Sequence, residues 1–199
     1  MKYFLDTEFI EGFHRPPFGK RRHFIDLISI GIVCEDGREY YAISTDFDKR
    51  DADEWVKKNV IEKLPERYAP FSDPGTSPRA RREAMQWKSN KTILSEMLNF
   101  FGCWRDQLFY RAPEGIEVYG YYADYDWVLF CSLFGRMIDL PKGFPMYCRD
   151  LKQMMDERGL SKDWKRENCP DPDGEHNALE DAKWNLKLFA TLNPHSITK

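Results

Sequence analysis

Two acids near the start of the chain, Asp6 and Glu8, are separated by a single residue. They end an apolar run, 3–5, which contains neither Gly nor Pro and predicts a buried central strand. Because side chains alternate across a strand, Asp6 and Glu8 should point to one side and Thr7 to the other. Neighbouring carboxylates raise each other's pKa unless a cation lies between them, and carboxylate oxygens suit Mg²⁺ or Mn²⁺. The spacing therefore indicates metal-ion chemistry, although a strand that ends in solvent with two surface acids has the same pattern.

A second pair of acids, Asp124 and Asp126, lies where an apolar run, 116–122, passes into a predicted helix. In open α/β sheets, ligands bind at such junctions, beyond the carboxyl ends of the strands. Asp124 precedes the apolar stripe of the helix and is placed to cap it through backbone N–H groups. Asp126 falls in the first turn, where it could lean over the end of the sheet, and we therefore favour Asp126 as the ligand.

A third motif places His176 just before a helix that should run from 178 to about 192. Asn177 followed by Glu180 favours a capping box at the start of that helix. Asp181 then lies within the second turn. A histidine that titrates near neutral pH suits proton transfer beside a carboxylate that binds metal. Taken alone, the motif is more often a surface histidine ahead of an ordinary capped helix.

The elements that must position these side chains form one α/β domain, 1–199, by length and pattern. We expect a mixed five-stranded sheet, a three-strand antiparallel meander plus parallel strands, flanked by helices. The predicted strands are 3–5, 25–34, 38–44, 116–122 and 145–149. The predicted helices are 52–64, 89–104, one that Asp124 caps, 150–158 and 178–192. The first of them carries Trp55, Val56, Val60 and Leu64 on one stripe. Two polar stretches rich in Pro predict irregular segments: 67–86, with room for a short helix, and 163–174.

A basic segment, 12–23, separates the first two strands and contains Gly and Pro, which predicts a loop or a loosely closed hairpin arm. Arg21 and Arg22 stand in this arm, close in the chain to the two acids. Their position favours contact with phosphate groups. The alternative is a charged tip that only meets solvent.

Composition narrows the class of protein. The five Cys include no CxxC pair, which argues against a zinc ribbon or a disulfide framework and favours a reducing compartment. The start of the chain has no signal-peptide pattern, and no apolar run approaches the length of a membrane span. We therefore expect a cytoplasmic protein that binds no membrane. The net charge of −3 does not by itself indicate a nucleic-acid partner.

The three motifs together, Asp-x-Glu, Tyr-Asp and His-x₄-Asp, occur in an order that resembles the DEDDh family of 3′–5′ exonucleases, which have the ribonuclease H-like fold. Asn177 stands where the sister group has a Tyr. The chain resembles more closely a small bacterial 3′–5′ exoribonuclease subfamily, through the stretches Asp6–Phe9, IDLISIGIV, DGREYYAIS, WVKKNVIEKLP, YYADYDWVLF and HNALEDA. The arm, 12–23, is longer than this subfamily leads us to expect.

The resemblance implies that four carboxylates hold two divalent ions, Mg²⁺ or alternatively Mn²⁺: Asp6, Glu8, Asp126 and Asp181. It also implies that Glu8 takes part in catalysis and that His176 is the general base. Two ions roughly 3.5–4 Å apart would activate a water and neutralise charge on the attacking and leaving oxygens. The implied product is a nucleoside 5′-monophosphate released from a 3′ end.

The implied partner is nucleic acid, RNA 3′ ends in particular, with a homodimer as a further option. Substrate contacts are expected at Thr7, Phe9, Arg21 and Arg22. RNA and DNA differ at the 2′-OH, whose protein partner the residues do not identify, so a DNA exonuclease stays an alternative. So do a nuclease that cuts internally and a catalytically inactive nucleic-acid-binding module on the same fold. A two-carboxylate glycosidase fits poorly, because adjacent acids on one strand face do not flank a sugar.

Overall fold

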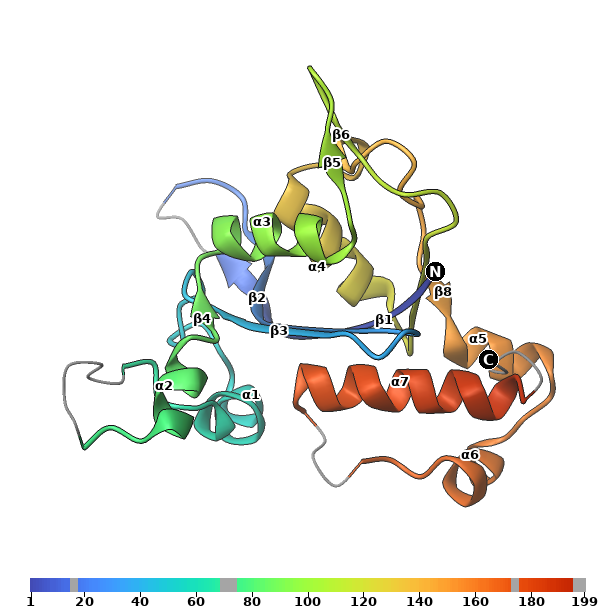
Figure 1. Ribbon diagram of the computed structural model, residues 1–199. Helices are drawn as coiled ribbons and strands as arrows, with labels where there is room; N and C mark the ends of the chain where they lie inside the picture. Colours follow the sequence, from blue (N-terminus) through green and yellow to red (C-terminus); the bar gives the residue numbers. More distant parts are fainter. Residues whose placement is uncertain (15–17, 69–74, 173–175, 195–199) are drawn as a thin grey trace.

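A mixed sheet lies at the centre of the molecule, with helices on both faces (Figure 1). The computed structural model describes residues 1–14, 18–68, 75–172 and 176–194. The strands of the main sheet are β1 (Lys2–His14), β2 (Arg22–Cys34), β3 (Glu39–Ser44), β4 (Trp87–Lys88), β7 (Glu117–Gly120) and β8 (Arg149–Asp150). A separate ribbon pairs β5 (Trp104–Arg105) with β6 (Tyr110–Arg111).

The helices are α1 (Glu54–Asn59), α2 (Pro78–Ala84), α3 (Asn90–Phe100), α4 (Asp124–Phe134), α5 (Leu151–Glu157), α6 (Lys162–Asn168) and α7 (Ala178–Leu192). Two short 3₁₀ turns, η1 (Ile61–Lys63) and η2 (Met137–Asp139), follow α1 and α4. Helices α3 and α4 cover one face of the sheet and α7 lies along the other (Figure 1). Within the described residues, no helix is long and apolar enough to cross a membrane.

The sheet has six strands in the order β4-β3-β2-β1-β7-β8, so the predicted number of five is wrong. The antiparallel meander β1-β2-β3 is as predicted, and β7 and β8 join it as parallel strands. The additional strand is β4, whose Trp87 pairs with Ile43 of β3. Its two residues are too few to show a side-chain period, which is why the pattern did not reveal it.

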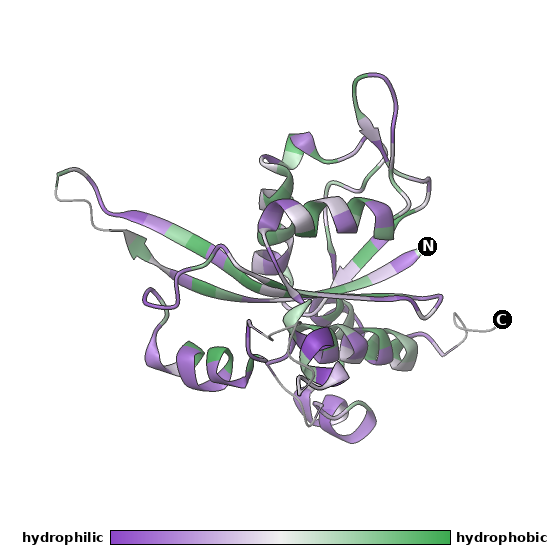
Figure 2. Cartoon of the chain, turned by 60° about the vertical axis from the view of Figure 1, so that its left-hand side comes forward, coloured by the Kyte–Doolittle hydropathy of each residue, from purple (hydrophilic) through white to green (hydrophobic). Residues whose placement is uncertain are grey.

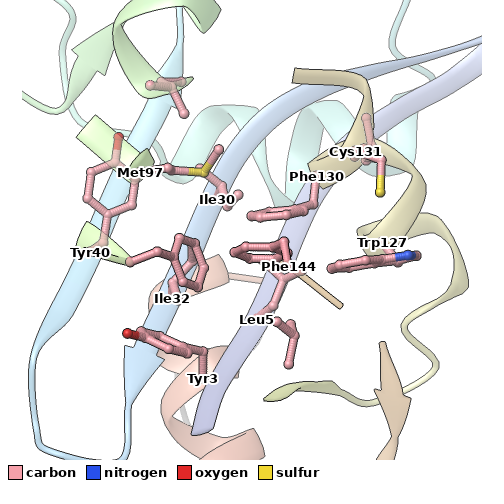
Figure 3. Packing of buried hydrophobic residues seen from close by; sticks show 14 of the residues in the cluster. Tyr3, Leu5, Ile30, Ile32, Tyr40, Met97, Trp127, Phe130, Cys131 and Phe144 are labelled. Carbon is pink, nitrogen blue, oxygen red and sulfur yellow. The ribbon is translucent and has the colours of Figure 1, made fainter. Parts of the chain in front are cut away.

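Alternation along β1 divides its side chains between the two faces. Tyr3 and Leu5 pack with residues of α3 and α4 (Figure 3), whereas Phe4 packs with residues of α7. By the same period, Asp6 and Glu8 share one side, as predicted, and that side is the one that α7 covers, whereas Thr7 faces α4. The run of apolar residues continues on both faces because β1 is central and covered on both sides.

The described parts of the arm, 12–14 and 18–23, extend the β1–β2 pair beyond the helices (Figure 2). Pairing continues to His14 and Arg22, so β1 is far longer than the predicted run, 3–5. Residues 15–17 lie outside the described ranges. On this arm the guanidinium of Arg21 lies 3.6 Å from the ring centroid of Phe13.

Helix α6 occupies part of the stretch 163–174, where an irregular segment was expected. The hydroxyl of Ser161 accepts a hydrogen bond from the N–H of Trp164 and caps this helix. The short helix carries no sustained apolar stripe, so periodicity did not distinguish it from a loop. Within 67–86, the short helix that the sequence allowed is α2, formed by Pro78–Ala84, and 69–74 lie outside the described residues.

Helix α7 approaches β2 at Gly31. A Cβ atom built at Gly31 would lie 2.1 Å from the carbonyl oxygen of Ala178, in the first turn of α7. Asn177 caps this helix by accepting hydrogen bonds from the N–H groups of Leu179 and Glu180. The absence of a side chain at Gly31 therefore lets the start of α7 lie directly against the sheet.

We expect Gly31→Ala to lower the free energy of unfolding by about 1–3 kcal/mol or more, because backbone atoms of α7 must move to admit the methyl group. Thermal unfolding measures this as a drop of several degrees in Tm. Gly12→Ala is the matched control in the same strand pair, since a Cβ there would meet only the movable ring of Phe24, at 2.8 Å. Equal melting temperatures for the two variants would contradict the close approach of α7.

Candidate active site

Carboxylates from the two ends of the chain meet on the α7 side of β1. One ligand atom from each of Asp6, Glu8 and Asp181 lies within 4.8 Å of the other two. Asp6 and Glu8 come from β1, and Asp181 comes from the N-terminal part of α7. The structure thus brings together three predicted ligand residues, two of which lie more than 170 positions from the third.

Asp126 approaches the same place from the start of α4. Its side chain is buried, and its Oδ1 accepts hydrogen bonds from the N–H of Thr7 at 2.8 Å and from the Thr7 hydroxyl at 2.6 Å. These bonds join the Asp-x-Glu segment to α4 and fix one oxygen of the carboxylate.

Asp124, the other acid of this segment, is exposed. The expectation that Asp124 caps the helix is wrong, because α4 begins at Asp124 itself and its N-cap is Ala123. The side chain of Asp150 accepts a hydrogen bond from the N–H of Ala123 instead, at 2.9 Å. The structure therefore separates the two candidate acids, with Asp126 inside the site and Asp124 in solvent.

These groups line one pocket of about 320 Å³. Its walls include all the predicted carboxylates and proton-transfer groups, together with two predicted substrate contacts: Asp6, Thr7, Glu8, Phe9, Asp126, His176 and Asp181. Arg21 and Arg22, the other predicted contacts, lie on the arm and are not among its lining residues. The ring of Phe9 stacks on that of Tyr125 with 5.6 Å between centroids, so an aromatic pair borders the acids.

Burial, and for Asp6 and Glu8 also the charges of neighbouring acids, raises the pKa values of the carboxyl groups in the pocket. Burial raises the pKa of Asp6 well above its usual range, and the charges of Asp126, Asp181 and Glu8 add to the effect. Burial, followed by Asp181 and Asp126, raises the pKa of Glu8 to about 8. For Asp126, burial raises the pKa to about 6 against the opposing hydrogen bonds from Thr7.

A divalent cation would lower these raised pKa values, since it favours the charged form of every carboxylate around it. The donor set consists of hard oxygen atoms, which suit Mg²⁺ or Mn²⁺. Asn185, one turn after Asp181 in α7, adds a side-chain oxygen beside the pocket that bonds to no described residue. The residues present therefore fit a divalent ion.

His176 enters the pocket from the segment before α7. Its backbone N–H donates to Oδ2 of Asp181 at 3.0 Å, and its φ of 69° lies in the left-handed region, which is uncommon for residues other than glycine. Its ring and that of Trp55, in α1, form a T-shaped pair with 4.8 Å between centroids. Asp181 thus fixes the backbone of His176, and Trp55 contacts its ring.

Several residues in or beside the pocket were missed in the sequence. Trp55 was placed only on the stripe of the predicted helix 52–64, but it is 54% exposed and contacts His176, which lines the pocket. Lys165 lies on α6, which was predicted to be a loop. Asn185 is a buried polar residue within an apolar helix face, and its amide donates to the carbonyl of Leu5 at 2.9 Å. A polar residue four positions after Asp181, in an otherwise apolar stripe, was the available signal.

The chain is similar to known proteins over nearly its whole length. The family model of the 3′–5′ exoribonuclease Rv2179c-like domain matches residues 1–193. Two curated relatives from Mycobacterium tuberculosis are each 36% identical to the chain over 192 residues, which is 96% of this chain and 93% of theirs. They are named 3′–5′ exoribonuclease Rv2179c, from strain ATCC 25618 / H37Rv, and 3′–5′ exoribonuclease MT2234.1, from strain CDC 1551 / Oshkosh. A solved structure of the yeast NOT1 MIF4G domain co-crystallised with CAF1 aligns with a TM-score of 0.47 at 11% identity, covering 100% of this chain and 81% of that one.

The raised pKa of Glu8 makes the stability of the metal-free protein depend on pH. A carboxyl whose pKa rises on folding, here from 4.5 to about 8, stabilises the fold fully below its unfolded pKa and loses that contribution as pH rises. We therefore expect the Tm measured in chelator to fall by several degrees between about pH 5 and about pH 8. Saturating Mg²⁺ should largely restore it, because the ion binds the folded chain only.

Glu8→Gln is the control for this measurement, since the amide has nearly the same shape and cannot ionise. In chelator its Tm should depend less on pH than that of the wild type. If Tm depends on pH in the same way for the two proteins, the pKa of Glu8 is not raised by folding.

Proposed function

The chain belongs to the family of the 3′–5′ exoribonuclease Rv2179c-like domain, and from this membership we propose that it removes nucleotides from RNA 3′ ends by metal-dependent hydrolysis. The observation that carries the proposal is the convergence of Asp6, Glu8 and Asp181, with Asp126 beside them, in one pocket. We take 1–199 as one exonuclease domain of the ribonuclease H-like, DEDDh type. The mixed sheet flanked by helices and the order of the motifs support that assignment.

Asp6, Glu8, Asp126 and Asp181 would hold two divalent ions, Mg²⁺ or Mn²⁺. When bound, such ions acidify a water and neutralise charge on the reacting phosphate oxygens. The hydrogen bonds from Thr7 to Asp126 orient one ligand, and the backbone of His176 orients another, Asp181. These hydrogen bonds would hold the carboxylates in fixed orientations for binding the cations.

His176 would take the proton of the attacking water. Its ring lies in the pocket, against Trp55, and an imidazole nitrogen can accept the proton of a water bound there. The proton leaves the water as the bond to phosphorus forms. The bond to the leaving 3′ oxygen of the upstream nucleotide then breaks, and a nucleoside 5′-monophosphate is released.

Substrate contacts follow from the walls of the pocket. Phe9, stacked on Tyr125, offers an aromatic face for the 3′-terminal base, and base stacking of this kind tolerates any sequence. Arg21 and Arg22 project on the arm, where phosphates of a longer RNA would reach them. The choice of RNA rests on the names of the relatives. A cytoplasmic location and a homodimer stay predictions.

A time course of digestion tests the proposal. We expect a 5′-labelled single-stranded RNA to shorten one nucleotide at a time with Mg²⁺ or Mn²⁺, to yield 5′-monophosphates, and to stay intact in chelator. His176→Ala should lower the rate roughly a hundredfold or more, yet keep the Mg²⁺-induced rise in Tm.

A matched DNA of the same sequence separates the alternatives. Faster loss of the DNA would favour a DNA exonuclease, and internal RNA fragments would indicate a nuclease that cuts within the chain. RNA binding without cleavage would indicate an inactive binding module. A His176→Ala protein that no longer binds Mg²⁺ would contradict its role as a base.

The neighbouring acids of α4 give a second test. Asp126→Asn should abolish hydrolysis while keeping the fold, because asparagine can still accept the Thr7 hydrogen bonds but carries no charge for an ion. Asp124→Asn is the control and should keep most of the activity, since Asp124 is exposed. Hydrolysis rates with Tm values check both variants. An inactive Asp124→Asn protein beside an active Asp126→Asn protein would reverse the assignment.

A further inference from the structure

A second hollow, of about 280 Å³, adjoins the acidic pocket. The two hollows share Tyr121, Lys165 and Asp171 in their walls. Beyond this shared wall, the second hollow adds Tyr122, Lys162 and Arg166 and none of the clustered carboxylates. Its lining therefore holds three cations and two tyrosines against one carboxylate, Asp171, in contrast to the acidic pocket beside it.

Lys165 is the fixed charge at the boundary. Its side chain is only 14% exposed and pairs with Asp171. Its Nζ lies 4.9 Å from the ring centroid of Trp184 and 5.3 Å from that of Tyr121. A lysine that is buried to this degree is stable only when it is paired, so the ammonium is held in place between the two hollows.

The other cations of the second hollow, Lys162 and Arg166, are more exposed to solvent. Lys162 and Arg166 stand four residues apart in α6, a spacing that places their side chains on one face of the helix. Arg166 pairs with Asp163, but the two side chains are 71% and 75% exposed, so water screens the pair and a phosphate can replace the carboxylate. Tyr122 is 59% exposed beside them, and its ring is 4.8 Å from that of Tyr121.

We propose that this second hollow, the α6 subsite, binds the sugar-phosphate chain of the nucleotides upstream of the 3′-terminal one, an inference that rests on the proposed exoribonuclease function. The α6 subsite is defined by Tyr122, Lys162, Lys165 and Arg166. The terminal nucleoside contributes no phosphate beyond the scissile one, whereas each upstream nucleotide adds another. Three cations beside an exposed tyrosine match phosphates and a stacked base of single-stranded RNA.

Length dependence of hydrolysis tests this subsite. A dinucleotide with a 5′-hydroxyl carries only the scissile phosphate, while a hexanucleotide of RNA carries four more upstream. In the double variant Lys162→Ala/Arg166→Ala, kcat/KM should fall for the hexanucleotide. The factor by which it falls should be about ten times larger than the factor for the dinucleotide. The log–log salt slope for binding the hexanucleotide, measured by fluorescence anisotropy in Ca²⁺, should become shallower by about one to two units.

Arg136→Ala is the matched control. Arg136 is an exposed arginine paired three residues away with Asp139, as Arg166 is with Asp163, but it follows the far end of α4. This variant should retain the length dependence and salt slope of the wild type, and melting curves should show that both proteins are folded.

Equal losses on the two substrates, or an unchanged salt slope, would overturn the α6 subsite while leaving the exoribonuclease function in place. A wild-type protein that cleaves neither substrate, with Mg²⁺ or with Mn²⁺, would instead contradict the proposed function itself and the subsite that presupposes it.

Discussion

Electrostatic repulsion among the acids of the pocket is the constraint on which the rest of the structure depends. Asp6, Glu8 and Asp181 have ligand atoms within 4.8 Å of one another, and burial adds to the cost of their charges. Buried charges of the same sign repel each other strongly, and the repulsion separates the elements that carry them unless other contacts hold these elements together. The fold must therefore supply rigid attachment at β1, α4 and α7, and it must do so without the ions that would neutralise the site.

Packing and a few buried hydrogen bonds provide that attachment. Side chains of β1 are covered on both faces, so the strand cannot move toward either helical layer without opening a cavity in the core. Contact between Gly31 and the start of α7 sets the height of Asp181 above the sheet. Asn185 then ties α7 to the backbone of β1 at Leu5, and Thr7 ties β1 to Asp126. Each of these contacts lies within a few residues of an acid.

Sequence reasoning was effective where a local pattern had one physical explanation. The two-residue period placed Asp6 and Glu8 on one side of β1, and the apolar stripe with its Asn177 cap gave α7 with nearly its observed bounds. It failed where an element was too short to show a period, as in β4 and α6. It also failed where one pattern fitted two environments. Trp55 fits a buried helix stripe equally well whether the ring enters the core or leans on His176, and only the tertiary structure decides. The meeting of Asp181 with the acids of β1 is likewise a property of the assembled sheet. Only the order of the motifs and the family resemblance could suggest it in advance.

The arrangement of charges explains how an acidic chain can serve a polyanionic substrate. A net charge of −3 includes the acids gathered in one pocket, and these are the groups that divalent ions would neutralise. Metal binding would therefore remove repulsion between the site and a scissile phosphate before it supplies any chemistry. Lys165 lies in the same wall, where its burial and its contacts with Tyr121 and Trp184 keep a positive charge close to the acids. Affinity for RNA and affinity for metal should then be thermodynamically linked, because each ligand lowers the electrostatic cost of admitting the other. Such linkage would favour joint binding of ions and substrate over binding of RNA to the bare acids.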